Sequence, residues 1–229
     1  MVYNKEMKIF KHQELNLGYL DLQSTTTESG RKYVTPDGNS YPSITTILSS
    51  KGNPAIDAWR KRVGEKEAER ISRVAREIGN ALHDNSEKYL KNQMTKEDFS
   101  NLSNMDKWMF KSFKTLLDRI DNVIALETAL YSDNLKIAGR VDCIAEFDGV
   151  PAIIDFKNSK KPKKEEWIED YFLQATFYSY AFYERTGKLI ENIRILVCVR
   201  DGQIQVFEKN VKDYIKKLDN RVKEYYNQS

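Results

Sequence analysis

Cysteine is scarce in this chain of 229 residues, which contains only Cys143 and Cys198. The two thiols do not form a CxxC pair or any other metal-binding spacing. Both lie in apolar, strand-like runs, so we expect them to be reduced, buried side chains in a cytosol-like compartment.

Long hydrophobic runs are missing too. No segment approaches the length that a transmembrane helix needs, and the amino-terminal residues MVYNKEMKIFKHQ lack the apolar segment of a signal peptide. We therefore expect a cytoplasmic protein with no targeting signal and no membrane partner.

An excess of one charge is nearly absent, because 37 Lys and Arg residues are balanced by 34 Asp and Glu residues. Such a mild basic excess does not by itself indicate a nucleic-acid partner. With 40% hydrophobic and 31% charged residues the composition is that of a globular chain. The length favours a single domain over residues 1–229.

The first half of the chain is predicted to be mostly helical. Residues 1–50 form an arm, loosely attached up to about residue 30, followed by a hairpin around Pro36-Asp37-Gly38 and a short helix that Ser43 caps. Residues 51–122 form the helical part. Apolar residues recur at helical spacing from 55 to 93, where Gly64 and Gly79 can divide the segment into two or three helices.

A further helix is predicted from residue 102 to about 120, with Trp108, Phe113, Leu116 and Leu117 facing inward. Residues 123–229 form a β-rich core. Three strands are joined by the turn dipeptides Asp133-Asn134 and Asp148-Gly149, and a helix over 164–186, a second hairpin and a last helix follow. This order predicts an α/β fold with a mixed sheet of about five strands flanked by helices.

The Asp148-Gly149 turn predicts where three charged side chains lie. A two-residue turn places Phe147 opposite Val150, and counting outward places Asp142 opposite Asp155. Side chains alternate along a strand, so Lys157 shares the face of these two carboxylates, while the other face of the hairpin is apolar.

Two directly opposed carboxylates, with Cβ atoms about 5 Å apart, repel each other strongly when they are desolvated. Either one of them is protonated or a cation lies between them, and a hard divalent ion such as Mg²⁺ or Mn²⁺ suits carboxylate oxygens. The alternative is a solvated sheet edge on which Lys157 pairs with one Asp. If Asp133-Asn134 is also a tight turn, Glu127 pairs with Arg140 on the same face, as a site residue or as a structural partner of that arginine.

These residues belong to a longer series of motifs. GRVD at 139–142 is followed by a hairpin, by DFK at 155–157 and by QATFY at 174–178, and upstream lie YPSITTIL at 41–48, Trp59 and GNALH at 79–83. The series resembles the PD-(D/E)xK nuclease superfamily, in its RecB-like exonuclease branch, and within it the mitochondrial genome maintenance exonucleases with their phage and bacterial relatives. The resemblance covers residues 41–183 and implies a restriction-endonuclease-like fold. It also implies a protein of a bacterial or phage-infected cell.

The resemblance also implies roles for individual residues. The metal ligands for Mg²⁺ or Mn²⁺ fall on His83, Asp142, Asp155 and the carbonyl of Phe156, and the catalytic lysine falls on Lys157. The helix motif falls on Gln174 and Tyr178, which lie on one helical face. Asn80 stands where relatives often have Thr, and Val141 stands where many have Pro. Some relatives hold an iron-sulphur cluster with four cysteines, which a chain with two cannot form.

Nucleic-acid contacts are expected beside this site. Lys160, Lys161, Lys163 and Lys164 closely follow Lys157, and they can either clamp a phosphate backbone or form a solvated charge run. Ser43 and Thr45 match a motif that lies near nucleic acid in relatives, or they cap a helix. Arg60 can pair with a phosphate, and the adjacent Trp59 can stack on a base, although its place in an apolar stripe favours the core. His12 is expected on the surface.

The function predicted from these residues is a divalent-metal-dependent exonuclease that acts on single-stranded DNA. The alternatives are an endonuclease with the same site and a catalytically silent nucleic-acid-binding module.

Overall fold

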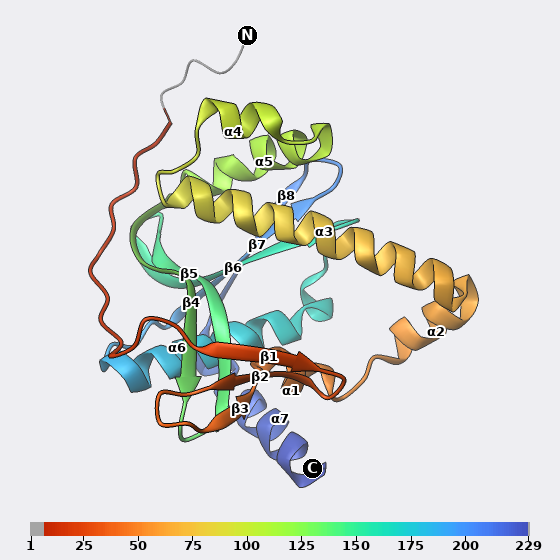
Figure 1. Cartoon of the computed structure of the whole chain (residues 1–229), viewed down its shortest axis with the longest axis vertical. Helices are drawn as coiled ribbons and strands as arrows, with labels where there is room; N and C mark the ends of the chain where they lie inside the picture. Colours follow the sequence, from red (N-terminus) through yellow and green to blue (C-terminus); the bar gives the residue numbers. More distant parts are fainter. Residues whose placement is uncertain (1–6, 229) are drawn as a thin grey trace.

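A computed structural model describes residues 7–228 of the chain, and it has three layers, with a central mixed sheet between two groups of helices (Figure 1). The central sheet has the strand order β4-β5-β6-β7-β8. Its strands are β4 (Ile120–Ser132), β5 (Ile137–Phe147), β6 (Val150–Ser159), β7 (Asn192–Val199) and β8 (Ile204–Asn210). Only β6 and β7 are parallel, so the fold is the predicted mixed α/β fold.

Helices cover both faces of this sheet. One face carries α3 (Glu65–Leu90) and α5 (Asn104–Leu117), and the other carries α1 (Ile44–Ser49), α6 (Glu169–Thr186) and α7 (Ile215–Gln228). The crossover from β6 to β7 passes through the short η1 (Glu165–Trp167) and α6, and η2 (Val211–Asp213) precedes α7. The remaining helices are α2 (Pro54–Val63) and α4 (Lys96–Asn101). Helices α2 and α3 form an arm that projects from one side of the molecule (Figure 1).

A second, smaller sheet comes from the amino-terminal region. It has the order β1-β2-β3 and consists of β1 (Gln23–Thr27), β2 (Gly30–Val34) and β3 (Ser40–Pro42). The predicted hairpin is therefore confirmed as β2 and β3, while β1 was not predicted. Its residues Gln23–Thr27 are all exposed, so they lack the alternation of apolar and polar residues that marks a half-buried strand.

Capping residues explain several of the helix boundaries. The Ser43 side chain accepts a hydrogen bond from the Thr46 backbone N–H at the start of α1, as predicted. Gly64, at φ 85°, separates α2 from α3, and Gly187, at φ 70°, ends α6. The possible break at Gly79 is wrong, because α3 runs through it. A Cβ at Gly79 would lie 3.3 Å from the Asn158 side chain, so this glycine lets α3 approach β6 closely.

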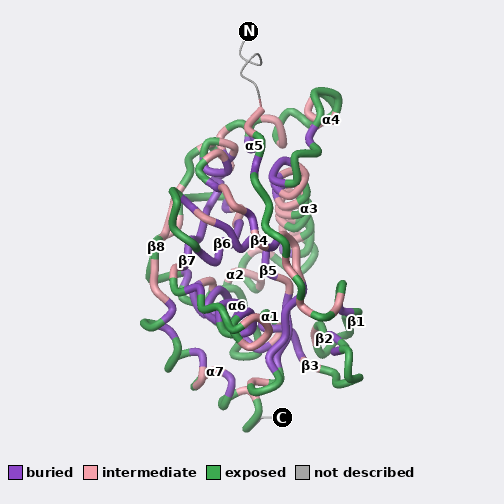
Figure 2. Tube along the Cα trace, turned by 90° about the vertical axis from the view of Figure 1, so that its left-hand side faces the viewer, coloured by how far each residue is buried: buried purple, intermediate pink, exposed green. Residues whose placement is uncertain are grey.

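The core lies on both faces of the central sheet, and its buried residues follow the strands and α6 (Figure 2). Cys143 and Cys198 are fully buried free thiols, as expected. Phe113, Leu116 and Leu117 are buried on α5. Trp108, however, is 53% exposed, so its predicted inward orientation is wrong. It lies against the β7–β8 turn, where a Cβ at Gly202 would be 2.7 Å from its ring.

The hairpin registers separate one correct prediction from one wrong one. Phe147 pairs with Val150 and Ile144 with Ile153, as the Asp148-Gly149 turn predicts, and the ladder ends at Cys143 and Ile154. The β4–β5 connection is instead a longer turn over residues 133–136. Arg140 therefore pairs with Ala129, and the predicted pairing of Glu127 with Arg140 is wrong.

The arm expected to be loosely attached is held firmly over the described residues 7–22. Phe10 is 2% exposed, and the Asn92 side chain bonds both its N–H and its carbonyl oxygen. His12 is exposed, as expected, but its Nε2 lies 2.9 Å from the Leu90 carbonyl oxygen. Within residues 7–228, no helix combines the length and the apolar character needed to cross a bilayer.

Candidate active site

A cleft of about 720 Å³ opens between α3 and the small sheet. Strands β4, β5 and β6 and helix α6 supply its other walls. Most of the site residues predicted from the hairpin and the helix motifs meet here, since the lining includes His83, Asp142, Lys157, Gln174 and Tyr178, whereas Asp155 and Phe156 lie behind it. Residues distant in the sequence thus form one polar cavity.

Asp142 lies where the β5–β6 ladder ends. Its side chain is 6% exposed, and its Oδ2 accepts a hydrogen bond of 2.7 Å from the Phe156 backbone N–H. The Asp142 carboxylate thus accepts the hydrogen bond that a backbone carbonyl would accept from β6, and this bond fixes the orientation of the carboxylate. Burial raises the pKa of Asp142, and the nearby positive charges of His83 and Lys157 oppose that effect.

His83, Glu127 and Asp142 form a compact group of potential metal ligands. One ligand atom from each lies within 4.8 Å of the others. His83 Nδ1 is 3.4 Å from Glu127 Oε1 and 3.6 Å from Asp142 Oδ1. Burial disfavours the charge on His83, but attraction to Asp142 and the hydrogen bond with Glu127 outweigh it and raise the pKa of His83 to about 9.

Glu127 reaches this group through an irregular backbone. Leu126 pairs with Cys143 and Thr128 with Val141, so Glu127 falls opposite Asp142 but outside the regular ladder. Its φ is 44°, a left-handed value that is unusual for a glutamate in a strand. Arg140 Nη1 donates a hydrogen bond to the Glu127 carbonyl oxygen. Glu127 is thus a partner of Arg140 through its backbone, while its carboxylate faces His83.

Asp155 and Lys157 form the other half of the site. Asp155 is 1% exposed, its Oδ2 lies 2.5 Å from Lys157 Nζ, and its Oδ1 has no hydrogen-bond partner. Burial above all, together with repulsion from Asp142, raises the pKa of Asp155 to about 6 against the opposing effect of Lys157. Burial acts to lower the pKa of Lys157, but attraction to Asp155 and Asp142 outweighs it and raises that pKa. The predicted pairing of Lys157 with one Asp is therefore present, but the sheet edge is not solvated, because Asp142 and Asp155 are 6% and 1% exposed. The predicted pair of Asp142 with Asp155 lies just beyond the regular ladder, which ends at Cys143 and Ile154.

Gln174 and Tyr178 project from α6, one helical turn apart. The Gln174 side-chain amide donates a 3.2 Å hydrogen bond to the Tyr178 hydroxyl, and both residues are buried. Tyr178 in turn lies against Gly139, where an added Cβ would be 2.9 Å from Tyr178 Cε1. The glycine of GRVD is therefore needed for the close approach of α6 to β5.

The residues predicted to contact nucleic acid are placed less uniformly. Ser43 and Thr45 line the cleft, although Ser43 also caps α1 and is 2% exposed. Arg60 lies on the projecting arm in an ion pair with Glu65 and is not part of the cleft lining. Trp59, expected in the core, is only half-buried. The loop lysines lie beyond β6 and outside the lining, with Lys160 and Lys161 exposed and Lys163 half-buried.

Several cleft residues were not found by reading the sequence. Asp21 and Arg140 both line the cleft and form an ion pair with Nη2–Oδ distances of 2.7 and 2.9 Å. Arg31 and Lys91 add further positive charge to the lining. Asp21 and Arg31 come from the segment that looked like a polar arm and hairpin, where no pattern points to a site. Only the fold brings this segment against β5.

The donor set suits a hard divalent cation. Carboxylates are ordinary ligands for Mg²⁺ or Mn²⁺, and a histidine ring is a ligand for transition metals. Asp155 Oδ1, buried without a hydrogen-bond partner, is the kind of atom that such an ion would satisfy. The residues present therefore fit a divalent metal, with His83, Glu127 and Asp142 already grouped around a possible position.

Comparison with known proteins gives the class to which this fold and site belong. Residues 55–227 match the model of the PD-(D/E)XK nuclease superfamily, and the chain belongs to that superfamily. Its members use divalent metals, in keeping with the ligand group described above.

Two curated relatives are both named mitochondrial genome maintenance exonuclease 1. The Homo sapiens protein is 30% identical over 148 residues, covering 61% of this chain and 40% of that protein. The Mus musculus protein is 33% identical over 138 residues, covering 55% and 39%. The match therefore spans about two fifths of each relative.

Among solved structures, the chain aligns with an Eubacterium rectale protein whose description names an exonuclease. The TM-score is 0.43 and the identity 12%, and the alignment covers 67% of this chain and 65% of that one. A protein named SSO0001 aligns with a TM-score of 0.37 and 15% identity, covering 74% and 70%. The family assignment rests on the sequence match.

Proposed function

We propose that the chain is a divalent-metal-dependent exonuclease that hydrolyses phosphodiester bonds of single-stranded DNA. The observation that carries the proposal is the buried Asp155, whose two carboxylate oxygens lack a hydrogen-bond partner, although Oδ2 forms an ion pair with Lys157, and whose pKa the charge of Asp142 raises. Two buried acids beside a polar cleft lower the stability of the fold unless a cation compensates their charge. They can hold such a cation beside a phosphate.

In this mechanism His83, Glu127, Asp142 and Asp155, with the carbonyl of Phe156, would hold the metal. A bound Mg²⁺ or Mn²⁺ would lower the pKa of a water molecule and neutralise charge that develops on the scissile phosphate. Lys157, which lines the cleft and is held by Asp155, would orient the attacking water or a phosphate oxygen. Gln174 and Tyr178 fix each other and close the wall next to Lys157, which limits the motion of a bound strand.

The recessed carboxylates support a single strand as the substrate. Asp142 and Asp155 are 6% and 1% exposed, so the reacting phosphate must enter the cleft. A flexible single strand can do this, whereas duplex DNA has a persistence length of about 50 nm and bends into a small recess only at high cost. The exonuclease names of the two curated relatives support attack from a strand end.

End-labelled single-stranded DNA tests the proposal, with Mn²⁺ in one reaction and EDTA in a second. We expect stepwise shortening with the metal, none with EDTA, and a loss of at least about 100-fold in Asp155→Asn. The matched control is Asp148→Asn, because Asp148 lies in an exposed turn, paired with Arg119 and outside the cleft lining. Cleavage that persists in EDTA or in Asp155→Asn would refute the mechanism.

A circular single strand separates the two modes of cutting. An exonuclease leaves the circle intact while it degrades the linear form of the same sequence. Loss of the circle would show an endonuclease with the same site, and binding without cleavage of either form would show a silent nucleic-acid-binding module.

A further inference from the structure

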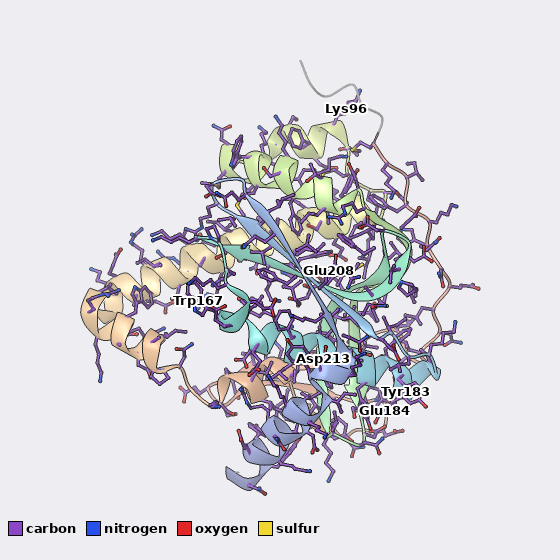
Figure 3. All side chains as sticks on the ribbon, turned by 180° about the vertical axis from the view of Figure 1, so that it is seen from behind. Lys96, Trp167, Tyr183, Glu184, Glu208 and Asp213 are labelled. Carbon is purple, nitrogen blue, oxygen red and sulfur yellow. The ribbon has the colours of Figure 1, made fainter. Side chains whose placement is uncertain are left out.

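Trp167 is the most exposed tryptophan on the described surface, with 63% of its area in solvent. It ends η1, on the side of the molecule toward which the α2–α3 arm projects (Figures 1 and 3). A tryptophan left in water forgoes a large hydrophobic gain, and neither the core nor the cleft described above uses it. Its exposure therefore calls for a ligand that covers an aromatic face.

The segment that presents Trp167 is firmly held. We call residues 160–164 the lysine loop. The Ser159 hydroxyl donates a 2.6 Å hydrogen bond to the Lys161 carbonyl oxygen, and the Gln205 side-chain amide bonds both the N–H and the carbonyl oxygen of Lys163, at 2.7 and 3.0 Å. Ile168, directly after Trp167, is 2% exposed and anchors the end of the segment. The indole thus stands on a rigid base, which lowers the entropy lost when a ligand stacks on it.

Most of the acids near Trp167 in the sequence are paired, since Glu166 lies 4.0 Å from Lys164 and the others pair with β8 and α7. Three acids of the following segment are neutralised from β8 and α7 in the pairs Glu165–Lys209, Glu169–Lys217 and Asp170–Arg221. In contrast, no ion pair joins Lys160, Lys161 or Lys163 to any residue in the described part of the chain. The Lys164 ammonium lies 5.1 Å from the Trp167 ring centroid. Unpaired lysines a few residues before an exposed aromatic ring are the composition of a single-strand binding surface.

This surface is connected to the catalytic residues. Tyr171, in the first turn of α6, follows Trp167 by four residues, and the Lys157 ammonium lies 5.1 Å from the Tyr171 ring centroid. Lys157 lines the cleft and lies near the end of β6, the strand that leads into the lysine loop. A strand whose phosphate lies at Lys157 can therefore continue along Tyr171 to Trp167.

We propose that Trp167 and the lysine loop form a platform for single-stranded nucleic acid, on which one base stacks against the indole while the lysines hold the flanking phosphates. This inference rests on the proposed function, because it describes how the substrate of that site is held outside the cleft. The platform recognises any base and therefore adds affinity without sequence preference.

Binding is measured by fluorescence anisotropy of a labelled oligothymidylate in EDTA, which prevents cleavage. Trp167→Ala should weaken binding about 5- to 150-fold, the range that corresponds to one base–aromatic stack, and Trp167→Phe should retain most of the affinity. The matched control is Trp108→Ala, because Trp108 is 53% exposed but lies against the β7–β8 turn. We expect this control to bind like the wild type.

An abasic strand of equal length identifies the stacking contact. It keeps every phosphate, so wild type and Trp167→Ala should bind it equally. Three results would overturn the platform: no binding of oligothymidylate by the wild type, a loss in Trp108→Ala equal to that in Trp167→Ala, or a loss in Trp167→Ala that persists on the abasic strand. Binding through Trp167 with no cleavage in Mn²⁺ would instead refute the exonuclease and leave the platform standing.

Discussion

Metal binding should stabilise the folded chain, because only the folded state brings His83, Glu127 and Asp142 together. With free Mn²⁺ at 100 times its Kd, the free energy of unfolding rises by about 2.7 kcal/mol. For a chain of 229 residues, each kcal/mol corresponds to about 2–4 °C in Tm. Thermal unfolding with Mn²⁺ and with EDTA should therefore differ by roughly 5–11 °C in Tm.

The decisive perturbation is Glu127→Gln, which keeps the shape of the side chain and removes its charge. The geometry gives Glu127 one of the three ligand atoms that lie within 4.8 Å of one another. Changes in the residues that merely support metal ligands weaken metal affinity by about 10- to 100-fold, so a ligand should cost at least the lower figure. At the same Mn²⁺ concentration a tenfold weaker Kd leaves about 1.4 kcal/mol, which is half of the wild-type shift.

The control for this experiment is Glu146→Gln. Glu146 lies on β5, the strand that pairs with β4, where it accepts a 2.7 Å hydrogen bond from the Asn122 side chain, and it is outside the cleft lining. Its Mn²⁺ shift should equal that of the wild type. If Glu127→Gln keeps the full shift while Asp155→Asn loses it, the ion is held by the Asp142–Asp155 pair that the hairpin pattern suggested. An unchanged Tm in the wild type would contradict the site altogether.

Three further outcomes follow from individual contacts. Lys157→Met should lower cleavage by about 10²- to 10⁴-fold yet retain the Mn²⁺ shift in Tm, because Lys157 is not a ligand; loss of that shift would contradict its assigned role. Gly139→Ala should destabilise the fold by about 1–3 kcal/mol in urea unfolding, since its Cβ would lie 2.9 Å from Tyr178 Cε1, and a neutral effect would refute that close contact. Cys143 and Cys198 should react with a thiol reagent only on unfolding, because burial raises the pKa of Cys143 well above its usual range and that of Cys198 to about 12; fast labelling of the folded chain would contradict their burial.

Turn chemistry explains why part of the site could be predicted from the sequence. Asp148 and Gly149 have φ values of 52° and 78°, as a two-residue hairpin turn requires, and the register from Phe147 to Cys143 follows from them. The Asp133-Asn134 dipeptide gave no such guide. Its turn extends to Lys136, at φ 55°, and the longer loop shifts every pairing of β4 with β5.

Contacts that depend on tertiary structure could not be predicted in the same way. The backbone irregularity that turns Glu127 toward His83 has no signature in the residues around it. Asp21 reaches Arg140 across more than a hundred residues of sequence, and nothing local to either residue indicates the pair. Trp108 fitted a helical apolar stripe, but the β7–β8 turn covers only one side of its ring. Periodicity predicts which face of a helix is apolar, but not how much of a large ring a neighbouring element covers.

The local geometry at Glu127 also bears on why the site exists. A left-handed residue within a strand costs about 1–3 kcal/mol and persists only where its surroundings impose it. Here the irregularity brings the Glu127 carboxylate toward Asp142, a buried acid whose charge is already opposed by desolvation. Core packing gains nothing from this, because the two apolar clusters on the faces of the sheet do not include the Glu127 side chain. Both the backbone strain and the charge repulsion act against folding at the same point, and a divalent cation bound between these side chains would offset them.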